Sequence, residues 1–295
     1  MIVPVPPAAV AVVSDSAPSL EAAFVLARAA ARPPASPPAT LSGAGPVAGK
    51  LAAIDALHDR IPGEPKARQI AALDALAAAA VADSQPPEVR AKALAYLGYS
   101  MPQVPDDAAR TRGLKVLLDA LKSPAYRLYA LRGLGPACHG LPLADDALLQ
   151  GALLDLLDGP VAGEERQTAL LALYAFVSTR DDLVTRAPAL IAQLDDRLLA
   201  PVEANPAGFV SDPRAAPGSR ALVLACLWSS ARHRHSLGNP AAVARVNALL
   251  DRLATLETDP VVRGWIKTYR DAAPPPPLTF RDSTVNRAPA GPDEP

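Results

Sequence analysis

Apolar residues recur every three to four positions along most of the chain, as in Leu114, Leu117, Leu118 and Leu121. This spacing puts one apolar stripe along a helix and is typical of amphipathic helices that pack against neighbours. Beyond residue 64, the pattern stops and restarts at short segments containing Pro, Gly or Ser. We therefore predict about five helix pairs, at 65–82 with 87–99, 107–122 with 124–135, 145–158 with 163–179, 183–200 with 217–234, and 240–257 with 260–271.

Prolines lie where the second helices of several pairs should begin. We expect Pro87, Pro124 and Pro260 to open such helices, because the first helical position needs no N–H donor. Ser123 and Asp259 precede two of these prolines, and both residue types are good N-caps. The pattern thus predicts helix–turn–helix units with short connections.

The helix pairs also repeat particular polar residues. An Asp closes an apolar run in the first helices, and an Arg precedes Ala-Leu or Val-Leu in the second helices. The Asp marks are about 36 to 56 residues apart, which brackets the period of known helical repeats. The widest interval holds a predicted loop at 200–217. We expect ladders between units that satisfy helix ends, built from Asp74, Asp119, Asp155, Asp195, Asp251, Arg90, Arg127, Arg166 and Arg220.

The composition supports an all-α fold. Half of the 295 residues are hydrophobic but only 4% are aromatic, and Ala and Leu, which favour helices, dominate. The net charge of −1 argues against a nucleic-acid-binding surface, which is usually strongly basic.

Two stretches resemble the HEAT-repeat family. Thr258-Asp259-Pro260-Val261-Val262-Arg263 is similar to the turn between helices in that family, and Pro87-Glu88-Val89-Arg90 with the later Leu97-Gly98 matches the same motif. The resemblance covers roughly residues 65–271, although Arg166 lacks a preceding Asp-Pro and Arg220 follows Gly-Ser. It implies a right-handed α-α superhelix, or solenoid, of about five HEAT-like helix pairs, whose second helices line the concave face.

The chain ends differ from the repeat region in composition. A helix is expected from Ser19 to about Ala31, and the proline run at 274–277 is either a plain tail or a ligand for a proline-binding module. We predict an extended or disordered lead at 1–18, N-terminal helices with a Pro-rich linker at 19–62, the HEAT-like domain at 63–271, and a disordered Pro-rich tail at 272–295.

Residues able to support catalysis or metal binding are few. His233 and His235 are two apart and would not face each other on a helix, although Cys226 is near in sequence. Cys138, beside His139, and Cys226 are predicted to be buried small hydrophobic residues. We therefore predict no catalytic residue, no metal and no cofactor.

Charged residues near predicted helix ends have a structural interpretation. Carboxylates at helix starts act as caps and complement the helix dipole, and a histidine at a helix end does the same with the opposite charge. We assign capping roles to His58 and to most of the acidic pairs Asp106-Asp107, Asp145-Asp146, Asp181-Asp182 and Asp195-Asp196.

Tyrosines are the residues that suggest binding. Tyr96 with Tyr99, and Tyr126 with Tyr129, form pairs three residues apart on the second helices of successive units. Tyrosine is enriched in protein interfaces, so these residues are the predicted partner-binding site, with core packing between units as the alternative. Trp228 and Trp265 are expected in the core.

These observations favour a non-catalytic protein–protein interaction scaffold or adaptor that binds another protein along the concave face. The alternative is a HEAT-like enzyme or a nucleic-acid-processing protein, and a third reading is an exported, envelope-associated scaffold. No apolar run reaches the ~20 residues of a transmembrane helix, and the proline-containing residues 1–13 make a poor signal peptide. The default expectation is therefore a cytoplasmic location, with export after removal of a signal as the alternative.

Overall fold

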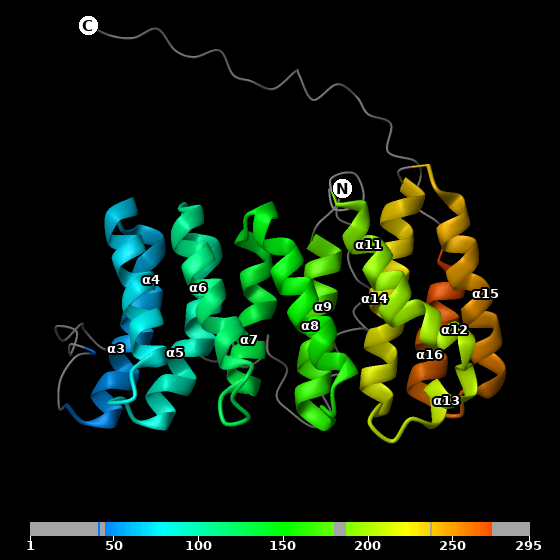
Figure 1. Cartoon of the computed structure of the whole chain (residues 1–295), viewed down its shortest axis with the longest axis horizontal. Helices are drawn as coiled ribbons and strands as arrows, with labels where there is room; N and C mark the ends of the chain where they lie inside the picture. Colours follow the sequence, from blue (N-terminus) through cyan, green and yellow to red (C-terminus); the bar gives the residue numbers. More distant parts are fainter. Residues whose placement is uncertain (1–40, 42–44, 180–186, 237, 273–295) are drawn as a thin grey trace, which may run out of the picture.

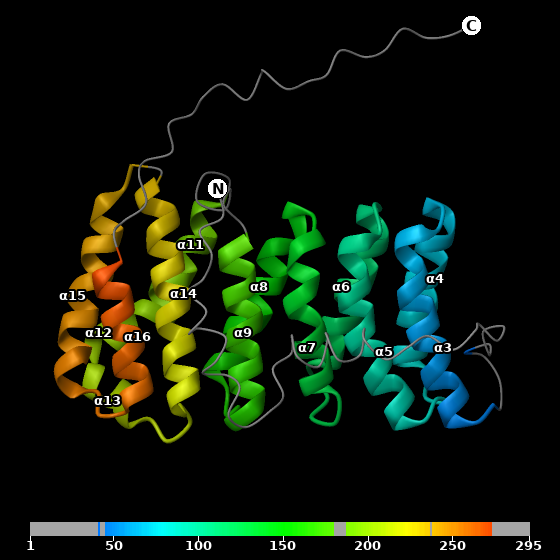
Figure 2. The same ribbon diagram turned by 180° about the vertical axis from the view of Figure 1, so that it is seen from behind.

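A computed structural model describes residues 41, 45–179, 187–236 and 238–272. Within these ranges every regular element is helical, and the helices follow one another along the long axis in sequence order (Figures 1 and 2). The α-helices are α3 (Val47–Arg60), α4 (Lys66–Val81), α5 (Pro87–Ser100), α6 (Asp107–Ala120), α7 (Arg127–Ala137), α8 (Asp146–Asp158), α9 (Gly163–Thr179), α11 (Pro188–Leu194), α12 (Ala200–Ala204), α13 (Pro206–Ser211), α14 (Pro217–Ser236), α15 (Pro240–Leu256) and α16 (Pro260–Asp271).

Short turns of other helix types extend several of these helices. A π-helix, η5, joins α11 to α12, so the three form one nearly continuous first helix of the fourth pair. The 3₁₀ turns are η1 (Ile61–Gly63), η2 (Met101–Gln103), η3 (Cys138–Gly140) and η4 (Leu143–Asp145), and the π-helix η5 is Asp195–Leu199.

The helices form two rows (Figure 1). In the second row, each helix packs against the next in the order α3, α5, α7, α9, α14 and α16. The first row holds α4, α6, α8, the α11–α12 segment and α15, and its members touch each other less than those of the second row do. A single apolar core between the rows reaches from Ile54 to Tyr269, and burial of this surface is the main force holding the helices together.

The closest approach in the second row is between α5 and α7. A Cβ atom added to Gly98 would lie 2.0 Å from the carbonyl oxygen of Gly133, which no side chain can tolerate. Glycine at both positions therefore lets the two backbones touch. The Leu-Gly ending noted in the sequence at Leu97-Gly98 is thus a packing requirement.

The repeated arginines cap the ends of preceding segments. Helix C-termini leave carbonyl groups without helical partners, and the guanidinium groups donate to them. Arg90 donates to Ala80 O at 3.2 Å, Arg127 to Leu121 O at 2.9 Å, Arg166 to Leu157 O at 2.9 Å, and Arg220 to Ala215 O at 2.7 Å. The prediction that these arginines satisfy helix ends is confirmed for Arg90, Arg127 and Arg166, whereas Arg220 donates to a carbonyl of the loop between α13 and α14.

The aspartate ladder is confirmed only in part. Asp74 pairs with Arg112 of the next unit at 3.0 Å, and Asp155 with Arg197 of the next unit at 2.9 Å. Asp195 pairs with Arg234 of its own unit at 2.6 Å and with Arg245 of the next unit at 3.4 Å. Asp251 pairs within its own unit, with Arg270 at 2.6 Å. Among the described residues, the Asp119 carboxylate bonds only Lys122, in the turn that follows α6, so the ladder prediction is wrong there.

The predicted helix pairs match α4 with α5, α6 with α7, α8 with α9, and α15 with α16 closely. The predicted loop at 200–217 is wrong, because it contains α12 and α13. Pro201 and Pro206 lie in the first turns of these helices, where proline is tolerated, and Asn205 accepts from Gly208 N at 2.9 Å as the N-cap of α13.

Some of the predicted helix starts are confirmed and others are wrong. Asp259 and Asp106 cap α16 and α6 with their side chains, as expected. Pro87 and Pro260 begin their helices, but α7 begins at Arg127 after a turn, so the predicted roles of Pro124 and Ser123 are wrong.

The remaining acidic pairs differ from the capping prediction. Asp145 makes no capping bond but accepts from Thr111 Oγ1 at 2.5 Å, and Asp195 begins the π-helix η5 and bonds arginines. The predicted lead, the helix at 19–31, Asp181-Asp182 and the tail beyond residue 272 lie outside the described residues.

Candidate protein-binding surface

Tyrosine and tryptophan are confined to one side of the molecule. All of them lie on second-row helices or at the start of α7, and none lies in α4, α6, α8, α11, α12 or α15. They are Tyr96, Tyr99, Tyr126, Tyr129, Tyr174, Trp228, Trp265 and Tyr269. Trp228 and Tyr269 belong to the buried core, whereas Tyr129 is exposed.

Tyr96 and Tyr99 form a ring cluster with His58 of α3. The Tyr96 ring centroid lies 5.2 Å from that of His58 and 6.3 Å from that of Tyr99, with edge-to-face geometry. Lys92 Nζ lies 5.3 Å from the Tyr96 ring centroid and bonds Asp55 at 2.7 Å. Burial, assisted by the charge and hydrogen bond of Asp55, raises the pKa of Tyr96, so its hydroxyl stays neutral and can donate.

His58 has a different role from the predicted cap. It lies in the last turn of α3, but its Nδ1 is 2.9 Å from Ser100 Oγ at the end of α5. The bond and the ring contact with Tyr96 fix α3 against α5. Histidine at this position therefore organises the tyrosine cluster.

Tyr129 contacts an arginine of its own helix. The Arg132 guanidinium carbon is 5.7 Å from the Tyr129 ring centroid, and Arg132 bonds Glu164 of α9 at 2.6 Å. Burial raises the pKa of Tyr99, and the positive charge of Arg132 opposes that rise. Tyr129 is the most exposed of the predicted tyrosines, at 36%.

Tyr126 is separate from this group. It is the N-cap residue of α7, and the Arg90 guanidinium carbon stands 4.6 Å above its ring. The structure thus brings Tyr96 and Tyr99 together in one ring cluster, places Tyr129 beside Arg132, and leaves Tyr126 in contact with Arg90 of the preceding unit. We call the group Tyr96, Tyr99, Tyr129, His58, Lys92 and Arg132 the tyrosine surface.

Sequence reasoning missed His58, Lys92 and Arg132 as members of this surface. The sequence signal that indicates them is the repeat spacing. Asp55 and Lys92 are 37 positions apart, and Arg220 and Glu257, which bond between two later units, have the same separation. That spacing marks α3 as the preceding member of the second row.

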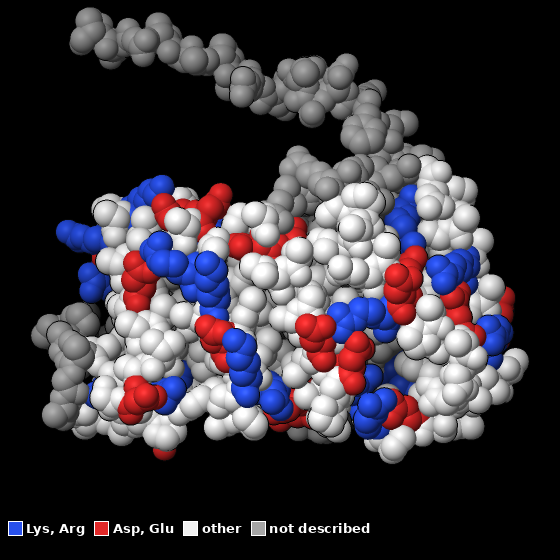
Figure 3. All heavy atoms as spheres, viewed as in Figure 1, with Lys and Arg blue, Asp and Glu red and all other residues white. Residues whose placement is uncertain are grey.

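The face shown in Figure 3 carries acidic and basic side chains next to each other. Several charged pairs on first-row helices are bonded between units, including Arg112 with Asp74 and Arg245 with Glu203. The largest exposed apolar side chain of the first row is Leu148 of α8, at 51%. Leu148 is therefore a suitable reference position on the row opposite the tyrosine surface.

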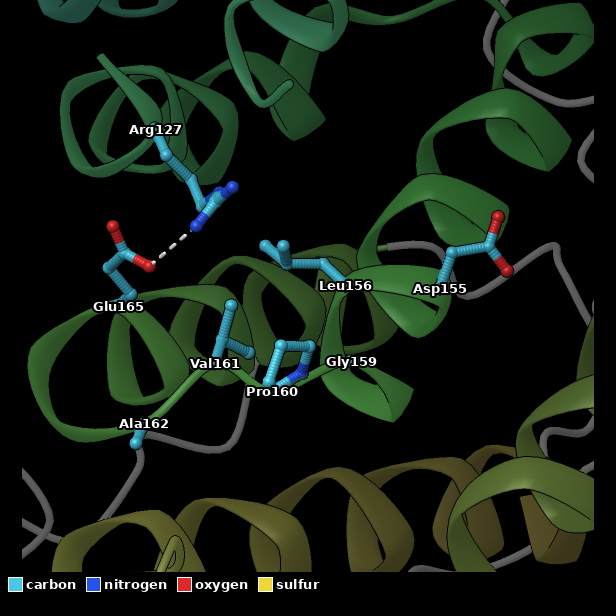
Figure 4. Close-up of a pocket in the computed structure, with 8 residues that line it drawn as sticks. All are labelled: Arg127, Asp155, Leu156, Gly159, Pro160, Val161, Ala162 and Glu165. Atoms are coloured by element: carbon cyan, nitrogen blue, oxygen red, sulfur yellow. Dashed lines mark hydrogen bonds and ion pairs between the residues drawn. The ribbon is translucent and has the colours of Figure 1, made fainter. Parts of the chain in front are cut away.

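A hollow of about 320 Å³ lies where α7 begins beside the turn from α8 to α9 (Figure 4). Arg127 and Glu165 face each other across it and are bonded at 3.1 Å. Arg127 also donates to Leu121 O, so both charged groups already serve the fold. The residues lining it are Arg127, Asp155, Leu156, Gly159, Pro160, Val161, Ala162 and Glu165.

Cys138 and Cys226 are both buried and are free thiols, as the sequence predicted. Burial raises the pKa of the Cys226 thiol, which disfavours the reactive thiolate. His233 and His235 lie in the last turn of α14. Among the described residues, no group of three or more His, Cys, Asp or Glu side chains is placed to hold a metal ion.

Trp228 is 4% exposed and belongs to the core, as expected, whereas Trp265 is partly buried against it. Across the described part of the chain, no helix combines the length and apolar composition needed to cross a bilayer. Comparison with known proteins finds no matching family model, no similar curated protein and no similar solved structure.

Proposed function

We propose that the protein is a non-catalytic scaffold or adaptor, built as a right-handed HEAT-like solenoid, that binds another protein through the tyrosine surface on the concave side. The observation that carries the proposal is the confinement of all Tyr and Trp residues to the second row, with Tyr129 exposed. Aromatic side chains offer large contact area at low entropic cost and dominate binding energy at protein interfaces.

The solenoid is supported by bonds between neighbouring units at a nearly constant separation. Arg112 and Asp74 are 38 positions apart, Arg127 and Glu165 are 38 apart, and Arg197 and Asp158 are 39 apart. A repeat that contacts only its neighbours gives this pattern. The closer packing of the second row favours it as the concave side.

The experiment is site-specific photocrosslinking with the full chain in cells of its own source. A photoreactive amino acid replaces Tyr129 in one variant and Leu148 in a matched variant on the other row. We expect one protein to crosslink in high yield from position 129 and not from position 148. Equal crosslinking from both positions, or crosslinking to nucleic acid alone, would contradict the proposal. The cytoplasmic location stays a prediction.

A further inference from the structure

The joints between second-row helices follow one sequence rule. Arg90, Arg127, Arg166 and Arg220 are equivalent, because each is followed three and four positions later by Ala-Leu or Val-Leu. The residue just before each arginine is therefore also equivalent from unit to unit. These preceding residues are Val89, Tyr126, Glu165 and Ser219.

We call the contact between two successive second-row helices a joint. In two successive joints, the residue that precedes the arginine of one unit contacts the arginine of the unit before. Arg90 of α5 stands over the Tyr126 ring, 4.6 Å from its centroid. Arg127 of α7 bonds the Glu165 carboxylate of α9 at 3.1 Å. Each guanidinium thus has a negative or π-electron partner besides the helix-end carbonyl that it caps.

The joint between α9 and α14 breaks this rule. The residue equivalent to Glu165 is Ser219, which is neutral and 1% exposed. Arg166 donates to Leu157 O, but no carboxylate of the described residues lies within 4.0 Å of it, and its Nε is buried without an acceptor. The Ser219 hydroxyl is also buried without a partner in the described part of the chain.

Ser219 faces α9. Cys226 lies two turns later on the same face of α14, and its Sγ points to Leu170 O of α9 at 3.8 Å. A Cβ atom on Gly218 would lie 3.1 Å from Gln167 Nε2, so the first turn of α14 sits beside the turn of α9 that carries Arg166. Pro217 has no N–H and the Arg220 amide donates to Ala216 O, so the amides of Gly218 and Ser219 supply the partial positive charge of this helix start.

The acidic groups whose charge acts on Arg166 are bonded to other arginines. Asp212 is bonded to Arg214 at 3.2 Å, and Asp158 is bonded to Arg197 at 2.5 Å. Burial lowers the pKa of the Arg166 guanidinium; Asp212 opposes this and Arg214 adds to it. The joint therefore holds two buried polar atoms, Arg166 Nε and the Ser219 hydroxyl oxygen, that have no hydrogen-bond partner among the described residues.

We propose that the joint between α9 and α14 binds a small oxyanion of the inorganic phosphate or sulfate class. The anion would occupy the position equivalent to that of the Glu165 carboxylate in the joint between α7 and α9. Arg166 would donate through its guanidinium, Ser219 through its hydroxyl and the first turn of α14 through its amides. A helix start combined with an arginine and a hydroxyl suits an oxyanion because each group donates and none is negative.

The test is calorimetric titration of the full chain with inorganic phosphate at constant ionic strength. We expect saturable binding to the wild type and no binding to Arg166→Gln. Ser219→Ala should weaken binding about tenfold, since a hydrogen bond to a charged group is lost. Ser219→Asp, which supplies a carboxylate from the chain itself, should abolish binding. Arg127→Gln is the matched control in the neighbouring joint and should bind phosphate as the wild type does.

Absence of phosphate binding to the wild type would overturn the proposal. Binding of wild-type strength to Arg166→Gln or Ser219→Ala would do the same, because the anion would then lie elsewhere. If Arg166→Gln lacks the native helical circular dichroism, Ser219→Ala decides the outcome. Ser219 is small and neutral, so that variant should fold.

Discussion

The ion pair between Arg220 and Glu257 should contribute more stability than any exposed pair. Arg220 Nε and Nη2 lie 2.8 and 3.0 Å from the two carboxylate oxygens of Glu257. The two side chains are only 10% and 1% exposed. Glu257 also accepts from the amides of Thr258 and Asp259, at 3.1 and 3.0 Å, so it organises the turn between α15 and α16.

Glu257→Gln keeps the side-chain size but leaves a buried guanidinium without its counter-charge. Breaking one partner of a buried pair costs about 3–5 kcal/mol. A chain of this size loses about 2–4 °C of melting temperature per kcal/mol, so we expect a fall of about 10 °C. Urea and thermal unfolding followed by circular dichroism measure both quantities.

The matched control is Asp251→Asn, which removes the pair between Asp251 of α15 and Arg270 of α16. That pair is 46% and 57% exposed, so its loss should cost at most about 1 kcal/mol. If Glu257→Gln were no more destabilising than Asp251→Asn, the reasoning from burial and bidentate geometry would be refuted.

Three further outcomes follow from the packing. Gly98→Ala should lower the free energy of unfolding in urea by at least about 2 kcal/mol, because the new methyl group would meet Gly133 O. Gly151→Ala has open space around it and should be neutral or stabilising. Equal effects of the two changes would contradict the close approach of α5 and α7. Asp119→Ala, which removes only an exposed local pair, should change the free energy of unfolding by less than about 0.5 kcal/mol, and a larger loss would restore the ladder at that position. Cys226 should resist thiol reagents in the native protein and react after denaturation, and rapid native labelling would contradict its burial.

The helix pairs were predictable because their signals are local. An apolar stripe such as that of Leu114, Leu117 and Leu121 predicts that the segment is a helix. A proline such as Pro87 or Pro260 marks where a helix begins. The loop predicted at 200–217 is wrong because Pro201 and Pro206 lie in the first turns of short helices, where proline is tolerated.

The binding surface was only partly predictable, because its members meet through tertiary packing. The spacing of Tyr96 and Tyr99 puts them near each other on one helix, and they do share a cluster. Nothing local in the sequence could show that His58 of α3 reaches them, or that Tyr126 caps α7 and lies apart from Tyr129. Such contacts depend on which helices become neighbours.

The central claim is that a protein partner binds the tyrosine surface. The most direct measurement is the dissociation constant of the crosslinked partner, once purified, for the wild type, Tyr129→Ala and Leu148→Ala. Both side chains are exposed, at 36% and 51%, so neither change should disturb folding. We predict at least about tenfold weaker binding for Tyr129→Ala and no change for Leu148→Ala. Unchanged affinity for Tyr129→Ala with a loss for Leu148→Ala would place the partner on the opposite row and contradict the claim.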